Sequence, residues 1–233
     1  MIVRTLAVIQ HTSADYLGLI EDHLEGRRIR FRYYRPFTGG RSLPGPGDLA
    51  GGLVLLGGGP WGSAGERDVP TLEAEVELTR HALATCAPVL AIGLGAQVLC
   101  RAAGGGSAVA PLVFDVGEGR RVRDDALNGF LPARFPLVRY MRDRPVLPDA
   151  AEVLAVDERG EPCIFCIGAR ALGFTGHPGM KTAMVEDLIM EFTEGPADPA
   201  AGLVALRERK QAIEDALVPI MTGVVQVLGL MEA

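Results

Sequence analysis

Residues 89–97 read VLAIGLGAQ and decide the fold. Val89–Ile92 is a short apolar run, typical of a strand that is buried on both faces of a parallel sheet. Gly93-Leu94-Gly95 then permits a sharp turn, and a helix is predicted over Ala96–Ala103. A buried strand, a glycine turn and an immediate helix form a nucleophile elbow, which presents one side chain beside a helix N-terminus. The segment therefore predicts an α/β fold with a functional site at the carboxyl end of this strand.

The chain on either side alternates apolar strands with amphipathic helices. Strands are predicted at Thr5–Gln10, Arg28–Tyr34, Gly52–Leu56, Ala151–Ala155, Ile164–Ile167 and Ala171–Thr175, and helices at Tyr16–Leu24, Leu72–Leu83 and Lys181–Phe192. Between Ala108 and Arg123 the pattern weakens into short strand-like pieces. This order predicts a flavodoxin-like three-layer fold, with a mainly parallel sheet sandwiched by helices.

The pattern divides the chain into a domain at 1–195 and a C-terminal helical extension at 196–233. A helix is predicted from about Gly202 to Leu217, and a second is expected to begin at Pro219, because proline suits a first helical turn. The end of the chain is apolar on more than one side, and such a helix needs cover. The extension is expected to pack on the domain or to form an oligomer interface.

Composition excludes several function classes. The 233 residues carry a net charge of −6 with a pI near 5.3, and no block of Lys and Arg, so neither nucleic acid nor a membrane is expected as a partner. No signal peptide or membrane span is predicted, because the apolar runs are too short. Four cysteines are few for this length, and a reduced, cytoplasmic protein is the simplest interpretation.

Four motifs, in order and spacing, resemble the class I glutamine amidotransferases, specifically the stand-alone branch similar to GMP synthase. The family has an oxyanion turn like GGP, an elbow G-I-C-L-G-x-Q, a W-H-G-D followed by L-P, and a base motif F-H-P-E. The corresponding stretches here are Gly58-Gly59-Pro60, Ala91–Gln97, Tyr140–Asp143 with Leu147-Pro148, and Thr175–Gly179. The resemblance covers about residues 5–192 and implies the fold of that family.

The same resemblance implies that most of the family's catalytic chemistry is absent. The nucleophilic cysteine falls on Gly93, the acid that orients the histidine falls on Gly179, and the histidine of W-H-G-D falls on Met141. Only the base position, His177, keeps its residue type. Loss of a nucleophile costs about 10⁶ in turnover in a well-studied hydrolase. Glutamine hydrolysis by the family's route is therefore not expected.

Several candidate site residues carry more than one interpretation. His177 is either a vestige held by its turn or a group that contacts a ligand, and His11 could join it in a metal or acid–base pair. Gln97 matches a glutamine-binding position of the family but could simply pack, and Trp61 either covers the pocket or plugs it. The pocket expected from the resemblance comprises Gly58, Gly59, Pro60, Trp61, Gly93, Leu94 and Gln97.

No metal site or cofactor is expected from the other reactive side chains. Cys100 is expected in the core, and Cys163 and Cys166 are expected on opposite faces of a strand, which disfavours a shared metal. Arg142 and Asp143 are expected to be surface loop charges.

The leading hypothesis is a catalytically degenerate amidotransferase-like protein, a pseudoenzyme that binds or scaffolds within a biosynthetic ligase or transferase system. The partners would be a heteromeric synthetase or transferase, a second copy of the chain, or a small-molecule ligand. One alternative is an enzyme of another class that uses His177, His11 or Gln97. A second alternative is an active amidotransferase whose nucleophile has been replaced by Gly93.

Overall fold

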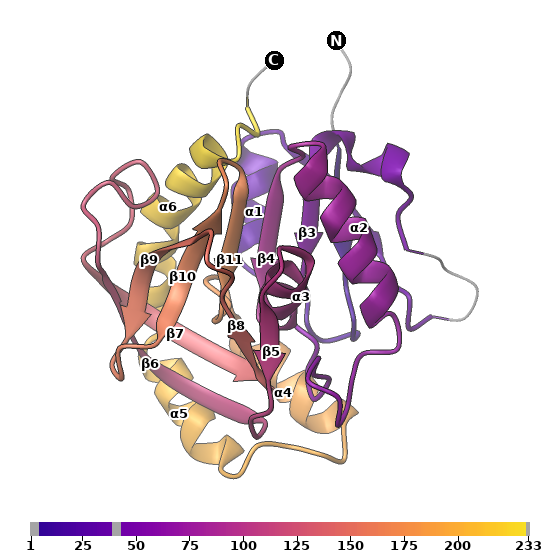
Figure 1. Ribbon diagram of the computed structural model, residues 1–233. Coiled ribbons are helices and arrows are strands. Elements are labelled where there is room, and N and C mark those ends of the chain that lie inside the picture. Colours follow the sequence, from indigo (N-terminus) through magenta and orange to yellow (C-terminus); the bar gives the residue numbers. More distant parts are fainter. Residues whose placement is uncertain (1–4, 39–42, 232–233) are drawn as a thin grey trace.

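The computed structural model describes residues 5–38 and 43–231, and a nine-stranded sheet runs through it (Figure 1). Its first five strands lie parallel to one another. In spatial order they are β2 (Arg30–Tyr34), β1 (Thr5–Ile9), β3 (Leu53–Leu55), β4 (Val89–Ile92) and β11 (Ala171–Phe174). The carboxyl ends of β3, β4 and β11 carry three of the four predicted motifs, and the fourth, Tyr140–Asp143, lies elsewhere in the sheet.

The other half of the sheet is antiparallel, so the prediction of a mainly parallel sheet is wrong. From β11 outward the order is β10 (Pro162–Ile167), β9 (Ala151–Asp157), β6 (Val113–Arg121) and β7 (Arg134–Met141). Four pairings are parallel and four antiparallel. Short turns join β9 to β10 and β10 to β11, and parallel neighbours would need long crossovers. The α/β class itself is confirmed, with a mixed sheet.

Helices cover both faces of the sheet. The helices α2 (Leu72–Ala84) and α3 (Leu94–Ala102) pack on one face, and α1 (Ile20–Gly26) and α6 (Lys210–Val227) pack on the other (Figure 1). A third apolar cluster joins α4 (Thr182–Glu191) and α5 (Pro199–Glu208) to β6 and β7. A short helix η1 (Pro46–Gly51) and a two-stranded ribbon of β5 (Gly106–Ala108) and β8 (Arg144–Val146) complete the fold.

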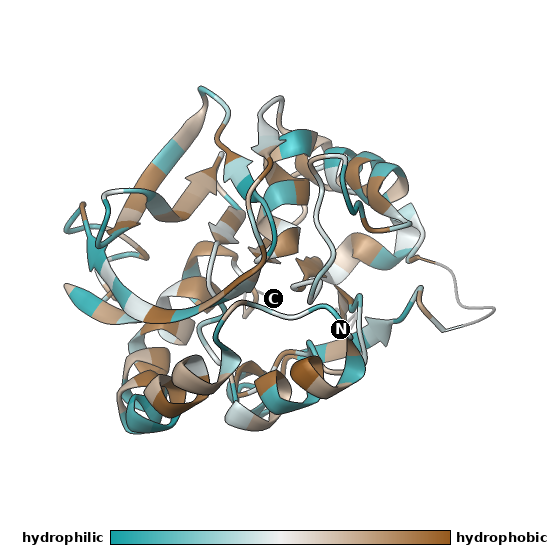
Figure 2. Ribbon diagram, turned by 90° about the horizontal axis from the view of Figure 1, so that it is seen from below, coloured by the Kyte–Doolittle hydropathy of each residue, from teal (hydrophilic) through white to brown (hydrophobic). Residues whose placement is uncertain are grey.

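The helices alternate apolar and polar segments, as expected where each has one buried face (Figure 2). Among the described residues, no helix is both long and apolar enough to cross a bilayer.

The two helices of the C-terminal extension meet at Arg209, because α5 ends at Glu208 and α6 begins at Lys210. The expectation that the second helix begins at Pro219 is wrong. Pro219 lies inside α6, which continues to Val227. An internal proline destabilises a helix by about 3 kcal/mol. Here Leu217, Ile220 and Val224 are almost fully buried on both sides of the proline. Their burial, worth about 1.5–3 kcal/mol for each large apolar side chain, outweighs the loss.

Cys163 and Cys166 do not point to opposite faces of β10, contrary to the expectation. Both side chains border the apolar cluster beneath α1 and α6. The register between β10 and β9 shifts around Ile164, and such a bulge inserts one residue and reverses the alternation. All four cysteines are free, and the described residues contain no group of three metal-ligating side chains.

Candidate functional site

The nucleophile elbow is formed, and its apex is Gly93. This residue has φ +58° and ψ −114°, and its N–H donates to the carbonyl of Phe174 at 2.8 Å. Such a φ is rare for residues with a side chain. A Cβ at this position would have a single neighbour within 4 Å, Gly57 Cα at 3.4 Å, which is an ordinary contact. The backbone therefore has the conformation of a nucleophile elbow, with space for a Cβ atom at the position that glycine occupies.

The turn at the end of β3 faces this elbow. Gly59 has φ +56°, and a Cβ at Gly58 would lie 2.5 Å from a methyl carbon of Leu94. Glycine is therefore required at Gly58 by close packing and is favoured at Gly59 by its conformation. Pro60 accepts a hydrogen bond from Arg142 at its carbonyl. The predicted pocket residues at the elbow and at this turn do come together.

His177 lies at the end of β11 with both ring nitrogens occupied. Nε2 lies 2.8 Å from the carbonyl oxygen of Tyr16, and Nδ1 lies 3.1 Å from the backbone nitrogen of Gly179. A carbonyl only accepts and an N–H only donates, so the ring must be neutral with its proton on Nε2. Burial lowers the pKa of His177 to about 4, in agreement with this state. No ring nitrogen is left to take a proton from a nucleophile at Gly93.

A side chain at Gly179, the position of the acid that would orient this histidine, would be crowded by its neighbours. A Cβ there would lie 3.0 Å from the backbone nitrogen of Ile20 and 3.3 Å from Leu19 Cβ. The Gly179 carbonyl also accepts the N–H of Leu19 at 2.9 Å. The start of α1 therefore crowds the space that a carboxylate side chain would need.

His11 pairs with a carboxylate that the sequence analysis did not find. Its Nε2 lies 2.8 Å from Glu75 Oε2, and its Nδ1 lies 2.9 Å from the carbonyl oxygen of Gly57. Both side chains are fully buried. Two acceptors require two donors, so the ring is an imidazolium, and the charge and hydrogen bond of Glu75 outweigh desolvation and raise the pKa of His11. Because Gly57 follows β3, this pair holds the start of the oxyanion-like turn.

Asp15 is a second buried carboxyl group at this edge of the sheet. It is 2% exposed, and burial raises its pKa to about 6 despite the nearby charge of His11 and a backbone hydrogen bond from Gly59. One of its oxygens, Oδ1, has no hydrogen-bond partner. Buried polar atoms are usually paired, so Asp15 marks a strained position beside the turn.

Gln97 is fully committed within the protein. Its side-chain oxygen accepts from Ser63 Oγ at 2.5 Å, and its nitrogen donates to the carbonyl of Arg142 at 2.7 Å. The amide is fully buried. The geometry matches the packing interpretation of Gln97, with no amide atom directed at open space.

Arg142 and Asp143 are not surface loop charges, contrary to the expectation. Asp143 is 4% exposed and accepts the backbone N–H groups of Ser63, Ala64 and Ala110 at 2.9–3.1 Å. A carboxylate that binds several backbone N–H groups organises loops distant in sequence. This position is the only one of Tyr140–Asp143 that keeps the residue type of the family motif.

Three charged side chains, Arg67, Arg142 and Glu194, cross the turn that follows Gly58, and we call them the strap. The guanidinium of Arg142 bonds both the Pro60 carbonyl and Glu194, and Arg67 bonds the same glutamate. The Arg67 guanidinium carbon also lies 4.9 Å above the Trp61 ring. Trp61 thus forms part of a cover over the turn.

The structure keeps the predicted histidines apart. His11 is bonded to Glu75 and Gly57, and His177 to Tyr16 and Gly179, so no His11–His177 pair forms. Met141 is buried and lines a separate cavity with Thr175. Glu75 had one signal in the sequence: it lies three residues after Leu72 and four before Thr79, on the buried stripe of its helix.

Comparison with known proteins shows the fold. Neither a family model nor a curated protein matches the chain. Solved structures do match. A glutamine amidotransferase from Methylobacillus flagellatus aligns with a TM-score of 0.78 and 20% identity, over 97% of this chain and 94% of that one. A glutamine amidotransferase from Thermotoga maritima aligns with a TM-score of 0.75 and 22% identity, over the whole of both chains. The protein SMU.1228c aligns at 0.80 and 19%, over 96% and 99%. The chain therefore has the α/β fold of class I glutamine amidotransferase structures.

Proposed function

We propose that the protein is an amidotransferase-like pseudoenzyme that does not hydrolyse glutamine and that serves as a binding or scaffolding subunit. The observation that carries the proposal is the bonding of His177. With Nε2 donating to Tyr16 and Nδ1 accepting from Gly179, the base position has no lone pair for a substrate or nucleophile.

Two further observations support the loss of hydrolysis. Gly93 offers no nucleophile, and the nearest alternative thiol on the elbow helix, Cys100, is buried with a pKa raised to about 12. A thiol in that state is neither ionised nor accessible, so it does not replace a catalytic cysteine. The alternative of an enzyme of another class that uses His11 or Gln97 is not favoured, because both side chains are hydrogen-bonded within the protein.

A cysteine at the elbow tests the proposal. Gly93→Cys has room for its Cβ, but the positive φ strains any side chain there, so thermal unfolding first verifies that the variant is folded. We expect no glutamate release from glutamine by either the native protein or the variant, because His177 cannot activate the thiol. Alkylation of the introduced thiol by iodoacetamide at pH 7 would report its reactivity. Full glutaminase activity in Gly93→Cys would overturn the proposal and would favour an active enzyme with a replaced nucleophile.

The partner belongs to the same proposal. Each of the three C-terminal helices exposes one large apolar side chain: Met190 on α4, Val204 on α5 and Val218 on α6. Exposed apolar side chains support a contact with a synthetase or transferase, or with a second copy of the chain. Light scattering during gel filtration separates a homo-oligomer from a monomer that awaits another protein. The four free cysteines support the expected cytoplasmic location.

A further inference from the structure

A pocket lies in the antiparallel half of the fold, beside Asp143. It has a volume of about 370 Å³ and is bounded by β6, β7, the β5–β8 ribbon and the turn between β9 and β10. That volume is within the range of about 300–1,000 Å³ that is usual for small-molecule sites. Met141 and Leu147 are among the apolar side chains of the lining, which also contains arginines and carboxylates.

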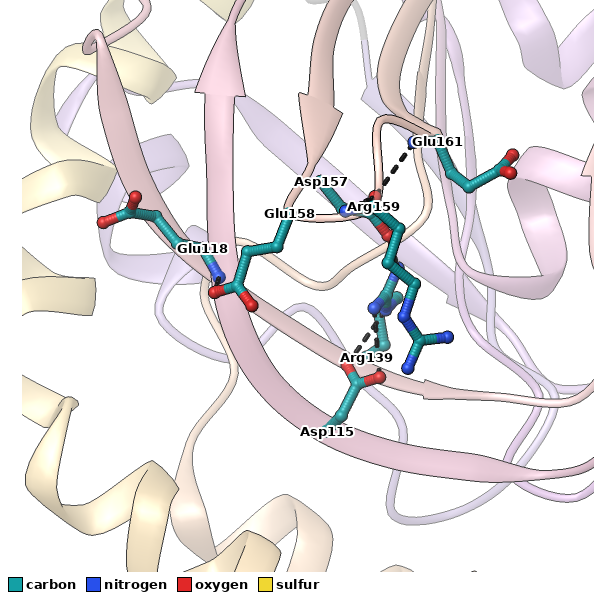
Figure 3. Close-up of polar contacts among 7 residues, drawn as sticks. All are labelled: Asp115, Glu118, Arg139, Asp157, Glu158, Arg159 and Glu161. Carbon is teal, nitrogen blue, oxygen red and sulfur yellow. Dashed lines mark hydrogen bonds and ion pairs between the residues drawn. The ribbon is translucent and has the colours of Figure 1, made fainter.

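The carboxylates of this pocket that are close to Arg139 are already bonded. Asp115 takes two hydrogen bonds from the Arg139 guanidinium, at 2.9 and 3.0 Å, and Asp157 takes one at 2.7 Å (Figure 3). Asp157 also accepts the backbone N–H groups of Arg159 and Glu161 at 2.9 Å. Together these bonds pair Arg139 with two carboxylates and fix the floor of the pocket.

Among the described residues, two arginines of the lining lack an acidic partner, while Asp143 of the same lining is held by backbone N–H groups. Arg144 and Arg159 line the pocket, and within residues 5–38 and 43–231 no carboxylate forms an ion pair with either guanidinium. Figure 3 shows the Arg159 side chain extending alongside Arg139, while Glu161 points away from the cluster. A guanidinium presents paired N–H donors that match a carboxylate or phosphate group.

Thr175 supplies an independent sign of a ligand. It follows β11 directly, is 5% exposed and lines this pocket, yet its hydroxyl has no hydrogen-bond partner. Buried hydroxyl groups nearly always have one. Thr175 and the two arginines line the same cavity, so one molecule that enters it borders all three residues.

We propose that this cavity binds a small organic anion, with its carboxylate or phosphate group on Arg144 and Arg159, its polar body on Thr175 and its apolar part against Met141 and Leu147. The inference does not depend on the loss of glutamine hydrolysis, because it uses neither Gly93 nor His177. It gives the protein a ligand site whose lining includes neither Gly93 nor His177.

Calorimetric titration of the full chain tests the site with three probes: benzoate, phenyl phosphate and uncharged benzamide. We expect at least one anion to bind about tenfold more tightly than benzamide, and its affinity to fall as salt is added. Preference for benzoate identifies a carboxylate ligand, and preference for phenyl phosphate a phosphate ligand. If neither anion binds, or if benzamide binds as well as both, the proposal is wrong.

Two variants and one control locate the binding. Arg159→Gln should weaken the preferred anion about tenfold, since an exposed arginine without an acidic partner can be replaced without unfolding. Thr175→Val should weaken it severalfold without lowering thermal stability, because it removes only an unpartnered hydroxyl. Arg120→Gln, on β6 but outside the cavity lining, should leave affinity unchanged. Equal affinities in Arg159→Gln and Arg120→Gln would place the anion elsewhere and overturn the assignment.

Discussion

A buried histidine follows each of the strands β1 and β11. The ring of one histidine is positively charged, and the ring of the other is neutral. His11 lies between two acceptors, Glu75 and the Gly57 carbonyl, and is an imidazolium. His177 lies between one acceptor and one donor and is neutral. Burial is alike at both places, so the hydrogen-bond partners decide the charge. The charged histidine supports a turn, while the histidine at the base position has no free nitrogen.

Removing the carboxylate at the β1 end should produce the largest change. Glu75→Leu leaves His11 buried without its counter-charge, and breaking one side of a buried ion pair costs about 3–5 kcal/mol. Urea unfolding at pH 7 measures the loss of stability. The matched control is Glu73→Leu on the same helix, where an exposed pair with Arg101 contributes about 0–1 kcal/mol. Equal stability of the two variants would show that His11 is not charged.

The β11 end should respond to pH through His177. The pKa of His177 is about 4 in the folded protein and 6.5 in the unfolded chain. Between these pH values the unfolded chain binds a proton at His177 and the folded protein does not. The contribution of His177 to the free energy of unfolding is complete above pH 6.5, and it falls by about 3 kcal/mol as the pH drops to 4. Unfolding of wild type and His177→Asn at pH 7 and pH 4 isolates it. The stability difference between the two proteins should shift in favour of the variant at pH 4, and a constant difference would contradict the neutral state.

Asp15 should show the reverse pH dependence at the β1 end. Its pKa is about 6 in the folded protein against 3.8 when unfolded, so the folded chain holds an extra proton between these values. Stability is therefore lost as the pH rises through this window, by about 2.5 kcal/mol between pH 4 and pH 7. The side chain in Asp15→Asn stays uncharged. The stability of this variant relative to wild type should therefore rise by about 2.5 kcal/mol from pH 4 to pH 7. If the gain is absent, Asp15 is ionised in the folded protein at low pH.

The smallest effect is expected at the strap between the two ends. Arg142→Lys keeps the charge but loses the forked bonding to Pro60 and Glu194, a change worth about 1 kcal/mol. Trp61 is the only tryptophan, so its fluorescence reports directly on the strap. We expect a shift of its emission in Arg142→Lys and none in Arg80→Lys, whose arginine pairs with Glu77 on the exposed surface of α2. Identical spectra would show that the strap does not hold Trp61.

The sequence predicted the parallel half of the fold well because its signals are local. Residues 89–97 contain the strand, the turn and the start of the helix in one continuous stretch, and Gly93 is at the apex as expected. The strands at 151–157, 162–167 and 171–174 were also located. Their antiparallel pairing was missed, although the short connections between them contained the information.

The rest depended on contacts between distant segments. No strand was predicted at Arg134–Met141, where a proline and two arginines obscure the pattern but pairing with β6 fixes the structure. Asp143 looks like a surface charge until residues 63, 64 and 110 approach it. The state of His177 is set by the Tyr16 carbonyl, which lies 161 residues away in the chain. Residue type alone identified the positions but not their partners.

Gly93 also bears on how such a protein can change over generations. Glycine and cysteine codons differ by as little as one base, and the elbow has space for the cysteine Cβ. A lineage can therefore recover the side chain in one mutational step. That change leaves His177 bonded to the Tyr16 carbonyl and the Gly179 amide, and a side chain at Gly179 would meet Ile20, the first residue of α1. A cysteine at the elbow would therefore not by itself give the site a histidine with a free ring nitrogen.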